Sequence, residues 1–540
     1  MKSIKINGKD YCVNSEITVL NFAKEQGINI PSFCYHRDVK TKNHCGLCTV
    51  IINGKIEYAC SVYLENGMDI ITDSEELFNI RKSNLEKIIN SHLLECDDCV
   101  WFQNCKLLSL AKKFDLNLVS KRNDQDEIFQ VDSIVFDQTK CIGCGNCIDV
   151  CPTGFLKLNE RGKIKLSEDV DCINCGQCIL HCPAGTIEGV GEFESLENIL
   201  KDKNRITVAQ FAPAIRTSIE EGSIATNKLV AALKEVGFDY VFDTAVGADF
   251  TTMEESDELI ERLNSKTRLP ALTSCCPAWV KFVEENYPQF IPNLCSVKSP
   301  QIILGEIVKK CWNKDAFVVS IMPCIAKKSE IKREELKGAV DMVLTTRELL
   351  RLFKKQKIDL EKIKGKETDS FLGLASGAGV IYGSSGGVFE SALRTAHFKI
   401  TGREINIEDI KDIRGMDGIK EKEIKVGNHL IRVCVVSGID NAIKVLENSS
   451  RYDAIEVMAC PGGCVGGGGQ PLPSNKSIIK KRSEGLYSID NNKDVRGAHN
   501  NPIIKEIYSK IKNPKEIFHT TYNKRGKSSI YKLKNSRETI

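Results

Sequence analysis

Residues 141–152 read CIGCGNCIDVCP, and residues 172–183 repeat the pattern as CINCGQCILHCP. Both copies have the form C-x2-C-x2-C-x3-C-P, the spacing of paired [4Fe–4S] clusters in which the fourth thiolate binds the other cluster. We therefore predict a bacterial-ferredoxin-like 2[4Fe–4S] domain over residues 119–200. One cluster is expected to take Cys141, Cys144, Cys147 and Cys182. The other is expected to take Cys172, Cys175, Cys178 and Cys151.

Upstream of this domain, residues 1–78 contain a different cysteine pattern. Short alternating segments over residues 3–13 and a helical stretch near 18–27 favour a β-grasp fold, the natural host of a plant-type [2Fe–2S] cluster. A CxxC turn with one thiolate before it and one after it is enough to hold such a cluster. The expected ligands are Cys34, Cys45, Cys48 and Cys60. Zinc, which accepts the same four thiolates, is the alternative.

Residues 79–118 are expected to form a small [4Fe–4S] domain with one histidine and three cysteine ligands. These ligands lie within SHLLECDDCVWFQNC and are His92, Cys96, Cys99 and Cys105. One imidazole and three thiolates suit either zinc or a [4Fe–4S] cluster, so the local pattern decides nothing by itself. The neighbouring cluster motifs favour iron.

Cysteine usage and composition limit the classes of protein to which this chain can belong. Sixteen of the 24 cysteines precede residue 183, and together their motifs indicate a chain of one-electron centres. A chain of 540 residues with 42% hydrophobic and 27% charged residues fits a multidomain globular protein. Its net charge of +3 is too small to indicate nucleic-acid binding. There is no long apolar run or signal-peptide core, so we expect a cytoplasmic protein.

From about residue 205 the pattern changes to alternating strands and amphipathic helices. Strand-like segments at 240–246, 316–324 and 432–438, with a helical segment at 230–238, predict an α/β domain. Three cysteine-bearing loops are expected at strand ends. They are TSCCPAW at 273–279, MPCIAKKSE at 322–330 and MACPGGCVGGGGQP at 458–471.

These three loops resemble the signature loops of the [FeFe]-hydrogenases, enzymes that interconvert protons and electrons with dihydrogen. The order of the N-terminal cluster motifs is similar to that of the larger clostridial members, and the resemblance runs from residue 1 to a closing HTTY at 519–522. It implies an α+β / α/β multidomain protein whose catalytic domain, residues 205–522, holds the six-iron H-cluster. A basic C-terminal tail is expected at 523–540, most simply as a solvated end.

The resemblance also implies the ligands of the H-cluster. Its [4Fe–4S] cubane would be held by Cys276, Cys324, Cys460 and Cys464, and Cys464 would bridge to a diiron subcluster that carries CO, cyanide and azadithiolate. Lys327 would donate to a cyanide ligand, and soft thioethers would pack around the diiron site from Met322 and Met458. Further contacts are expected from Pro213, Ala214 and Gln301. Without the resemblance, a lone lysine or methionine would be interpreted as surface charge or core filling.

A proton path is implied as well. Cys275 would be the thiol nearest the catalytic amine, and it would exchange protons with Glu255 and Glu258, assisted by Arg262. These three residues lie at i, i+3 and i+7 and therefore share one helical face. The simpler alternative is an exposed Glu258–Arg262 ion pair at i, i+4.

Two residues depart from the family pattern, and three further cysteines match no ligand spacing. Cys295 stands where many relatives carry a serine of the proton path, and a thiol is a weaker hydrogen-bond partner than a hydroxyl. Ala214 likewise replaces a serine found in some relatives. Cys12, Cys311 and Cys434 match no ligand spacing and are expected to be buried apolar residues.

The electron partner is expected to be a protein. Gly377 and Gly379 are followed by Gly383 one position too late for G-x-G-x-x-G, and GSSGG at 383–387 is better interpreted as a turn before a helix at 388–394. We therefore expect ferredoxin or flavodoxin, or a flavoprotein subunit, as electron carrier, and diiron maturation proteins as further partners. The alternatives are an electron-transfer subunit of a complex I-like dehydrogenase and a hydrogenase-like sensor or cluster-assembly protein.

Overall fold

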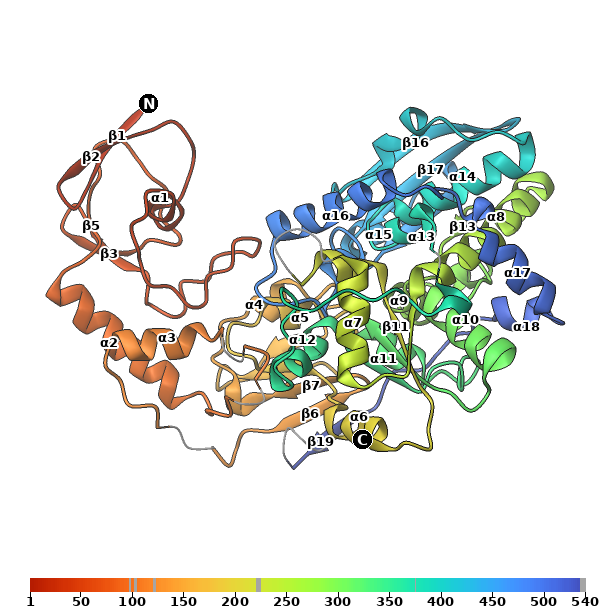
Figure 1. Ribbon diagram of the computed structural model, residues 1–540. Coiled ribbons are helices and arrows are strands. Elements are labelled where there is room, and N and C mark those ends of the chain that lie inside the picture. The colour runs from red at the N-terminus through yellow and green to blue at the C-terminus, as the bar shows by residue number, and fades with distance from the viewer. Residues whose placement is uncertain (97–98, 102–103, 120–122, 220–224, 374, 535–540) are drawn as a thin grey trace.

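The computed structural model describes all residues except 97–98, 102–103, 120–122, 220–224, 374 and 535–540. The N-terminal sheet lies at one end of the molecule, beside two helices (Figure 1), and a loop of the same unit contacts the next domain directly, since Lys42 pairs with Asp149 (2.7 Å). In this sheet β1 pairs in parallel with β5, and the other neighbours are antiparallel, which confirms the β-grasp prediction. Its strand order is β2 (Lys9–Val13), β1 (Lys2–Ile6), β5 (Asp69–Ile71), β3 (Thr49–Ile52) and β4 (Lys55–Tyr58). Helix α1 spans Val19–Glu25.

The bridge to the next domain is formed by α2 (Glu75–Asn90) and α3 (Lys106–Lys113). In this next domain, the two cysteine motifs of similar sequence lead into the short helices α4 (Asn146–Asp149) and α5 (Gln177–His181). A small sheet supports them, with strands β10 (Ile187–Gly189), β7 (Ile134–Asp137) and β6 (Ile128–Val131), beside the hairpin β8 (Leu156–Leu158) and β9 (Ile164–Leu166). The predicted ferredoxin-like arrangement is thus present.

The end of the chain returns to this domain, which corrects the expectation of a solvated tail after residue 523. Strand β19 (Ile530–Leu533) adds to the open edge of β6, with Ile530 opposite Val131. Just before it, the backbone N–H of Ser528 donates to Asp171 (2.8 Å). An unpaired strand edge offers backbone hydrogen bonds that outweigh the solvation of a basic tail. Residues 535–540 of the expected tail lie outside the described residues.

The C-terminal unit contains two sheets that face each other across a layer of helices (Figure 1). The first is fully parallel, with order β12 (Tyr240–Asp243), β11 (Thr207–Phe211), β14 (Phe317–Met322) and β15 (Met342–Thr345). The second has order β13 (Ala271–Leu272), β18 (Ala454–Met458), β17 (His429–Ser437) and β16 (Ile419–Val426), and only β16 is antiparallel. The predicted α/β class is confirmed.

The longest helix of this unit, α8 (Thr244–Ser265), starts directly after β12, where the Asp243 side chain caps it through the backbone N–H of Ala245. It packs between the sheets against α10 (Pro300–Ile307), α13 (Gly377–Ile381) and α14 (Gly387–Thr401). The other longer helices of the unit are α7 (Thr226–Val236), α9 (Pro277–Asn286), α12 (Thr346–Lys355), α15 (Ile439–Leu446), α16 (Lys476–Asn491) and α17 (Pro502–Lys510). Within the described parts of the chain, no helix has the length and apolar character needed to span a membrane.

The turn before α14 is capped from the neighbouring sheet, as Glu456 of β18 accepts hydrogen bonds from the backbone N–H groups of Gly386 (2.6 Å) and Phe389 (2.8 Å). A carboxylate at a helix N-terminus satisfies otherwise unpaired N–H groups and complements the helix dipole. Burial nevertheless raises the pKa of Glu456 to about 7. The cap locks α14 to the strand that carries the third cysteine loop.

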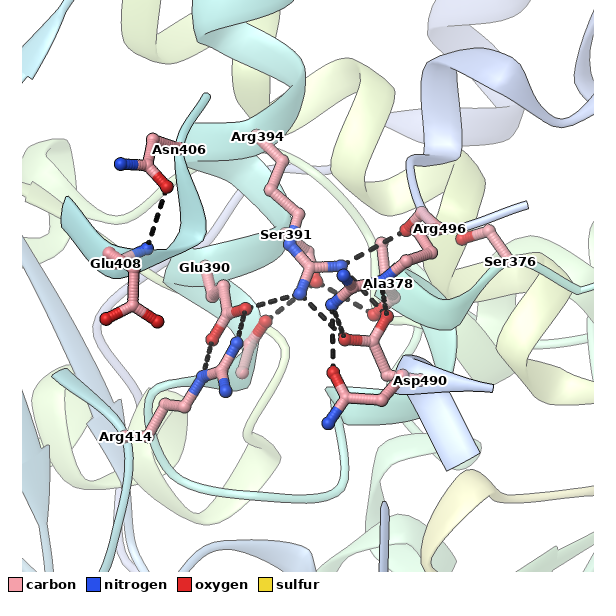
Figure 2. Close-up of polar contacts among 12 residues, drawn as sticks. Ser376, Ala378, Glu390, Ser391, Arg394, Asn406, Glu408, Arg414, Asp490 and Arg496 are labelled. Carbon is pink, nitrogen blue, oxygen red and sulfur yellow. Dashed lines mark hydrogen bonds and ion pairs between the residues drawn. The ribbon is translucent and has the colours of Figure 1, made fainter. Parts of the chain in front are cut away.

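A buried ion-pair network joins α14 to α16. Figure 2 shows Glu390 between the guanidinium groups of Arg394 and Arg414, and Asp490 between those of Arg394 and Arg496. Arg394 binds both oxygens of Asp490, at 2.9 and 2.8 Å. Both carboxylates are fully buried, so each depends on its arginine partners for the solvation that water would otherwise supply.

We expect Arg394→Ala to destabilise the C-terminal unit by about 3–5 kcal/mol, because the change leaves two buried carboxylates short of a partner. The matched control is Arg432→Ala, which breaks an exposed pair with Glu423 and should leave stability nearly unchanged. Thermal unfolding followed by circular dichroism measures both. Equal midpoints in the two variants would contradict a structural role for the network.

Candidate active site and cysteine relay

The three cysteine loops of the C-terminal unit meet at one buried cavity. Each follows the carboxyl end of a parallel strand, with Cys276 after β13, Cys324 after β14, and Cys460 and Cys464 after β18. The loops from the two sheets converge, and all four cysteines line the same cavity. The cysteines that the sequence selected are therefore brought together, although they lie far apart in the chain.

The four thiols suit a metal cluster. Burial raises the pKa of Cys324 to about 12 and also raises those of Cys460 and Cys464, and nearby thiols raise them further. Thiolates in such a place need a positively charged iron centre to be stable. Among the described residues, no three His, Cys, Asp or Glu side chains converge on a site for a single metal ion. The cysteines surround a cavity instead, and the donor set fits a [4Fe–4S] cubane.

The glycines of the third loop allow a close approach that no other residue would. Gly463 has φ +90°, and a Cβ atom there would lie 2.7 Å from the backbone nitrogen of Ser385. At Gly468 a Cβ would lie 2.5 Å from the carbonyl oxygen of Cys175, in the ferredoxin-like domain. The same contact region is tied by Gln177, whose side chain donates to the carbonyl of Gly466 (2.9 Å). The loop of the ferredoxin-like domain that carries Cys175 thus lies directly against the third cysteine loop, which lines the cavity.

Cys275 and Lys327 complete the polar part of the cavity. The Nζ atom of Lys327 donates to the carbonyl oxygen of Cys275 (3.2 Å) and pairs with Glu330 (2.8 Å), which also accepts from Gln301 (2.6 Å). Burial alone would lower the pKa of Lys327, but the charge and hydrogen bond of Glu330, together with the nearby cysteines, have the larger effect. The pKa of Lys327 therefore lies above its ordinary value. Lys327 is 8% exposed, so the surface-charge interpretation is wrong.

The remaining expected contacts also line the cavity. They are Pro213, Ala214, Gln301, Met322 and Met458. The Cys275 side chain packs in an apolar group with Ala248, Tyr382, Val388 and Met458. This setting raises the pKa of the thiol, first through burial and then through the charge of Glu255.

The acidic face of α8 points into the protein. Glu255, Glu258 and Arg262 are 4%, 7% and 1% exposed, so the interpretation as an exposed ion pair is wrong. Burial, followed by the charge of Glu258, raises the pKa of Glu255 to about 8. Its carboxylate accepts a hydrogen bond from Tyr382 (3.4 Å), which itself accepts one from Thr252 (2.9 Å). Glu255 can therefore exchange a proton near neutral pH.

Cys295 lies beside this acidic pair but in apolar surroundings. It belongs to a buried group that includes Leu259, and burial together with the charges of Glu258 and Glu255 raises its pKa. The hydroxyl that contacts Glu258 is that of the next residue, Ser296, at 3.0 Å. Sequence reasoning missed Ser296 and gave no role to His519, which Ser296 contacts at 2.8 Å. No spacing signal links residues 223 positions apart.

In the ferredoxin-like domain, two cavities are lined by the crossed sets that the motif predicts. The first is lined by Cys141, Cys144, Cys147 and Cys182. The second is lined by Cys151, Cys172, Cys175 and Cys178. The second set is the one next to the active-site cavity, through the carbonyl of Cys175.

The N-terminal cysteines form two close pairs. The Sγ atoms of Cys48 and Cys60 are 3.1 Å apart, and the backbone N–H of Cys45 donates to Sγ of Cys34 (3.4 Å). Two pairs of thiols suit the two irons of a [2Fe–2S] cluster.

His92 is buried, and its Nδ1 lies 2.9 Å from the carbonyl oxygen of Lys140. That contact assigns the proton to Nδ1 and leaves Nε2 with a lone pair that could bind a metal, and burial lowers the ring's pKa, which favours the neutral form. The cysteines of the same motif are half-buried, namely Cys96, Cys99 and Cys105.

The three cysteines without ligand spacing differ from one another. Cys434 is buried, as expected, and Cys311 is half-buried. Cys12 is exposed on the edge strand β2, so the expectation of a buried residue is wrong there.

Four family descriptions match the chain. Residues 205–468 match the iron only hydrogenase large subunit, C-terminal domain, and residues 476–525 match the iron hydrogenase small subunit. Residues 133–192 match the 4Fe-4S dicluster domain, and residues 2–75 match the 2Fe-2S iron-sulfur cluster binding domain. These matches overlap the regions predicted to hold the [2Fe–2S] cluster, the paired [4Fe–4S] clusters and the catalytic domain.

Individual relatives agree. The chain is 36% identical to the NADP-reducing hydrogenase subunit HndD of Solidesulfovibrio fructosivorans, over 97% of this chain and 99% of that one. It is 36% identical to iron hydrogenase 1 of Clostridium pasteurianum, over 94% and 96%. Among solved structures, an apo variant of the [FeFe]-hydrogenase HydA1 from Chlamydomonas reinhardtii matches 62% of this chain and 99% of its own, with a TM-score of 0.55 and 35% identity.

A eukaryotic cluster-assembly protein is similar over a smaller region. The cytosolic iron-sulfur assembly component 3 of Mus musculus is 29% identical over 57% of this chain. It does not extend over the chain as the two bacterial hydrogenases do. With its [2Fe–2S] and [4Fe–4S] modules and its H-cluster domain, the chain belongs to the [FeFe]-hydrogenases of the clostridial, multi-cluster type.

Proposed function

We propose that this hydrogenase reduces protons reversibly to dihydrogen with electrons from a low-potential protein carrier. The observation that carries the proposal is the single buried cavity at which four cysteines from both sheets meet Cys275 and Lys327. A dry cavity with a few polar groups is the setting in which a reactive cofactor is protected from water. When bound, the diiron subcluster would supply the metal chemistry by which protons and electrons combine.

The cubane would be held by Cys276, Cys324, Cys460 and Cys464, and Cys464 would also hold the diiron subcluster. The ammonium of Lys327, already oriented by Glu330, would donate to a cyanide ligand. Soft, polarisable contacts would come from Met322 and Met458. The remaining wall would be formed by Pro213, Ala214 and Gln301.

On the proton side, Cys275 would be the donor and acceptor nearest the cofactor, and Glu255 and Glu258 would connect it outward. Arg262 would orient Glu258 through their ion pair. The raised pKa of Glu255, about 8, suits a group that must both take up and release a proton near neutrality.

On the electron side, we propose one [2Fe–2S] and three [4Fe–4S] clusters in series. The expected domains, 1–78, 79–118 and 119–200, would each hold their clusters and deliver electrons to the catalytic domain at 205–522. The contact of Cys175 with the third loop supports this route, because it brings one ferredoxin-like cluster site next to the cubane site.

The carrier would be ferredoxin or flavodoxin, and the protein would work in the cytoplasm with diiron maturation proteins as partners. A groove of about 1090 Å³ beside the [2Fe–2S] module supports an acidic partner. Its lining is mainly basic, with one carboxylate, Glu25, against four cations, Lys24, Arg37, Lys106 and Lys113. Because the relative HndD is named as NADP-reducing, transfer to a separate flavoprotein subunit is the second candidate. Hydrogen evolution by the purified chain with reduced ferredoxin alone supports the first candidate, whereas evolution only with NADPH and an added NADPH-oxidising flavoprotein subunit supports the second.

The fully loaded chain should contain about 20 iron atoms, and expression without diiron maturation should give about 18 and no hydrogen activity. Metal analysis and infrared bands of metal-bound CO and cyanide measure this. Zinc at the His92 site, or activity without the diiron bands, would contradict the assignment.

Cys275→Ala should lower turnover by at least about 10²-fold while leaving the cluster spectra nearly intact, because a proton donor contributes to rate and not to assembly. Cys276→Ala is the matched comparison and should lose the cubane. If the two variants exchange these outcomes, the roles of the adjacent cysteines are reversed.

If Cys295 passes protons between Glu258 and Glu255, Cys295→Ser should keep or raise turnover, because a hydroxyl relays better than a thiol. Cys295→Ala should slow turnover by about 10²-fold. Hydrogen evolution with a saturating artificial electron donor measures both. Wild-type rates in both variants would make Cys295 an apolar packing residue.

A further inference from the structure

Glu258 sits at the inner end of a line of hydrogen-bonding side chains that reaches the surface. Its Oε2 accepts from the Ser296 hydroxyl (3.0 Å), whose oxygen lies 2.8 Å from Nδ1 of His519. On the far side of the ring, Nε2 lies 3.0 Å from Oε2 of Glu254. The hydroxyl of Tyr508 donates to the other oxygen of this carboxylate, Oε1. The side chains of Glu258 and His519 are 7% and 28% exposed, so the line runs from the interior to solvent.

The other oxygen of Glu258 contacts the side chain of an arginine. Oε1 is paired with Arg262, whose guanidinium also donates to the carbonyl oxygens of Arg268, Asn293 and Leu294. Arginine keeps its protons at any pH at which the protein is folded, so it orients Glu258 but is a poor proton carrier. Hydrogen bonding therefore directs exchange with solvent toward Oε2.

The segment that carries His519 is held in place by the backbone. The N–H of Lys298 donates to the carbonyl of Phe518 (2.7 Å), and the N–H of Thr520 donates to the carbonyl of Ser296 (2.8 Å). Phe518 in turn stacks on Phe250 of α8. The imidazole and the Ser296 hydroxyl are thus positioned before any proton moves, and α8, α17 and α18 (Pro514–Phe518) lie together at this edge of the molecule (Figure 1).

The outer end opens into a groove of about 470 Å³. Besides His519, its titratable lining consists of Lys298, Glu306, Lys310, Glu335 and Glu516. Burial raises the pKa of Glu254, but hydrogen bonds from His519 and Tyr508 outweigh it and lower the pKa below its ordinary value. Glu254 is therefore ionised near neutrality and orients the ring of His519 through Nε2.

We propose that Ser296 and His519 form the proton relay between Glu258 and the surface groove, a proposal that rests on the hydrogenase function above. In the inward direction, solvent protonates Glu254, and the carboxyl group passes this proton to Nε2 of the neutral ring. The proton on Nδ1 passes to the Ser296 oxygen while the serine's own proton passes to Oε2 of Glu258. One proton enters, one is delivered, and the ring regains its first tautomer by exchange with solvent. Hydrogen oxidation reverses each transfer.

The test uses His519→Ala and Ser296→Ala in the fully matured protein. With a saturating artificial electron donor, both should lower hydrogen evolution by about 10²-fold, the low end for losing a positioned acid–base group. External imidazole, which can enter the groove, should restore part of the His519→Ala rate. It should not restore that of Ser296→Ala, whereas Ser296→Thr, which keeps the hydroxyl, should stay near the wild type.

His499→Ala is the matched control. This ring makes a similar contact with Glu404 (2.9 Å), but its described contacts, with Thr395, Glu404 and Phe398, lead away from Glu258. Its rate should stay near the wild type, with no response to imidazole. If His519→Ala fails to fold, His519→Gln fills the same space without carrying protons and should show the same loss.

Infrared bands of metal-bound CO and cyanide distinguish failure of the relay from failure of the proposed function. Wild-type turnover in His519→Ala and Ser296→Ala, with these bands intact, would overturn the relay. A slow His519→Ala variant that imidazole leaves unchanged, with an unaltered solvent isotope effect, would also overturn it. Missing bands in the unaltered, matured protein would overturn the proposed function instead.

Discussion

A buried thiolate is costly unless a positive centre compensates its charge, and the architecture of this chain follows from that cost. In the active-site cavity, burial raises the pKa values of Cys324, Cys460 and Cys464 far above those of exposed thiols. An iron cluster removes the penalty, but only if the thiols are held at fixed points around it. The loops that follow parallel strands of two sheets, and that converge on one cavity, provide those points.

The ferredoxin-like domain is joined to the catalytic domain by contacts from two parts of the chain. Glycine at 468 lets the third loop touch the backbone of Cys175, and Gln177 fixes the contact with a hydrogen bond. From the other end of the chain, β19 adds a strand to the ferredoxin-like sheet. Electron transfer needs short, constant distances between centres, and these contacts supply a rigid interface where a flexible linker would not.

The residues of the proposed proton path are affected by burial in a different way. Glu255 and Glu258 are buried without a metal, so their mutual repulsion and burial raise the pKa of Glu255 to about 8. Arg262 compensates one oxygen of Glu258 and leaves the other to Ser296. One oxygen of Glu258 is thus paired with a cation that keeps its protons. The other oxygen contacts a hydroxyl that can exchange its proton.

The sequence by itself determined the parts of this protein that local spacing encodes. The paired C-x2-C-x2-C-x3-C-P motifs gave the crossed sets of cysteines, because a cluster requires its ligands at fixed intervals along the chain. Period-3.6 and strand-like segments gave the α/β class, and helical spacing placed Glu255, Glu258 and Arg262 on one face. What spacing cannot encode is which long-range neighbours a side chain meets. Only the tertiary structure decided that the acidic face is buried, that the C-terminal strand returns to β6, and that Ser296 and His519 touch. Those outcomes depend on packing and backbone pairing between segments hundreds of residues apart, and no local pattern carries that information.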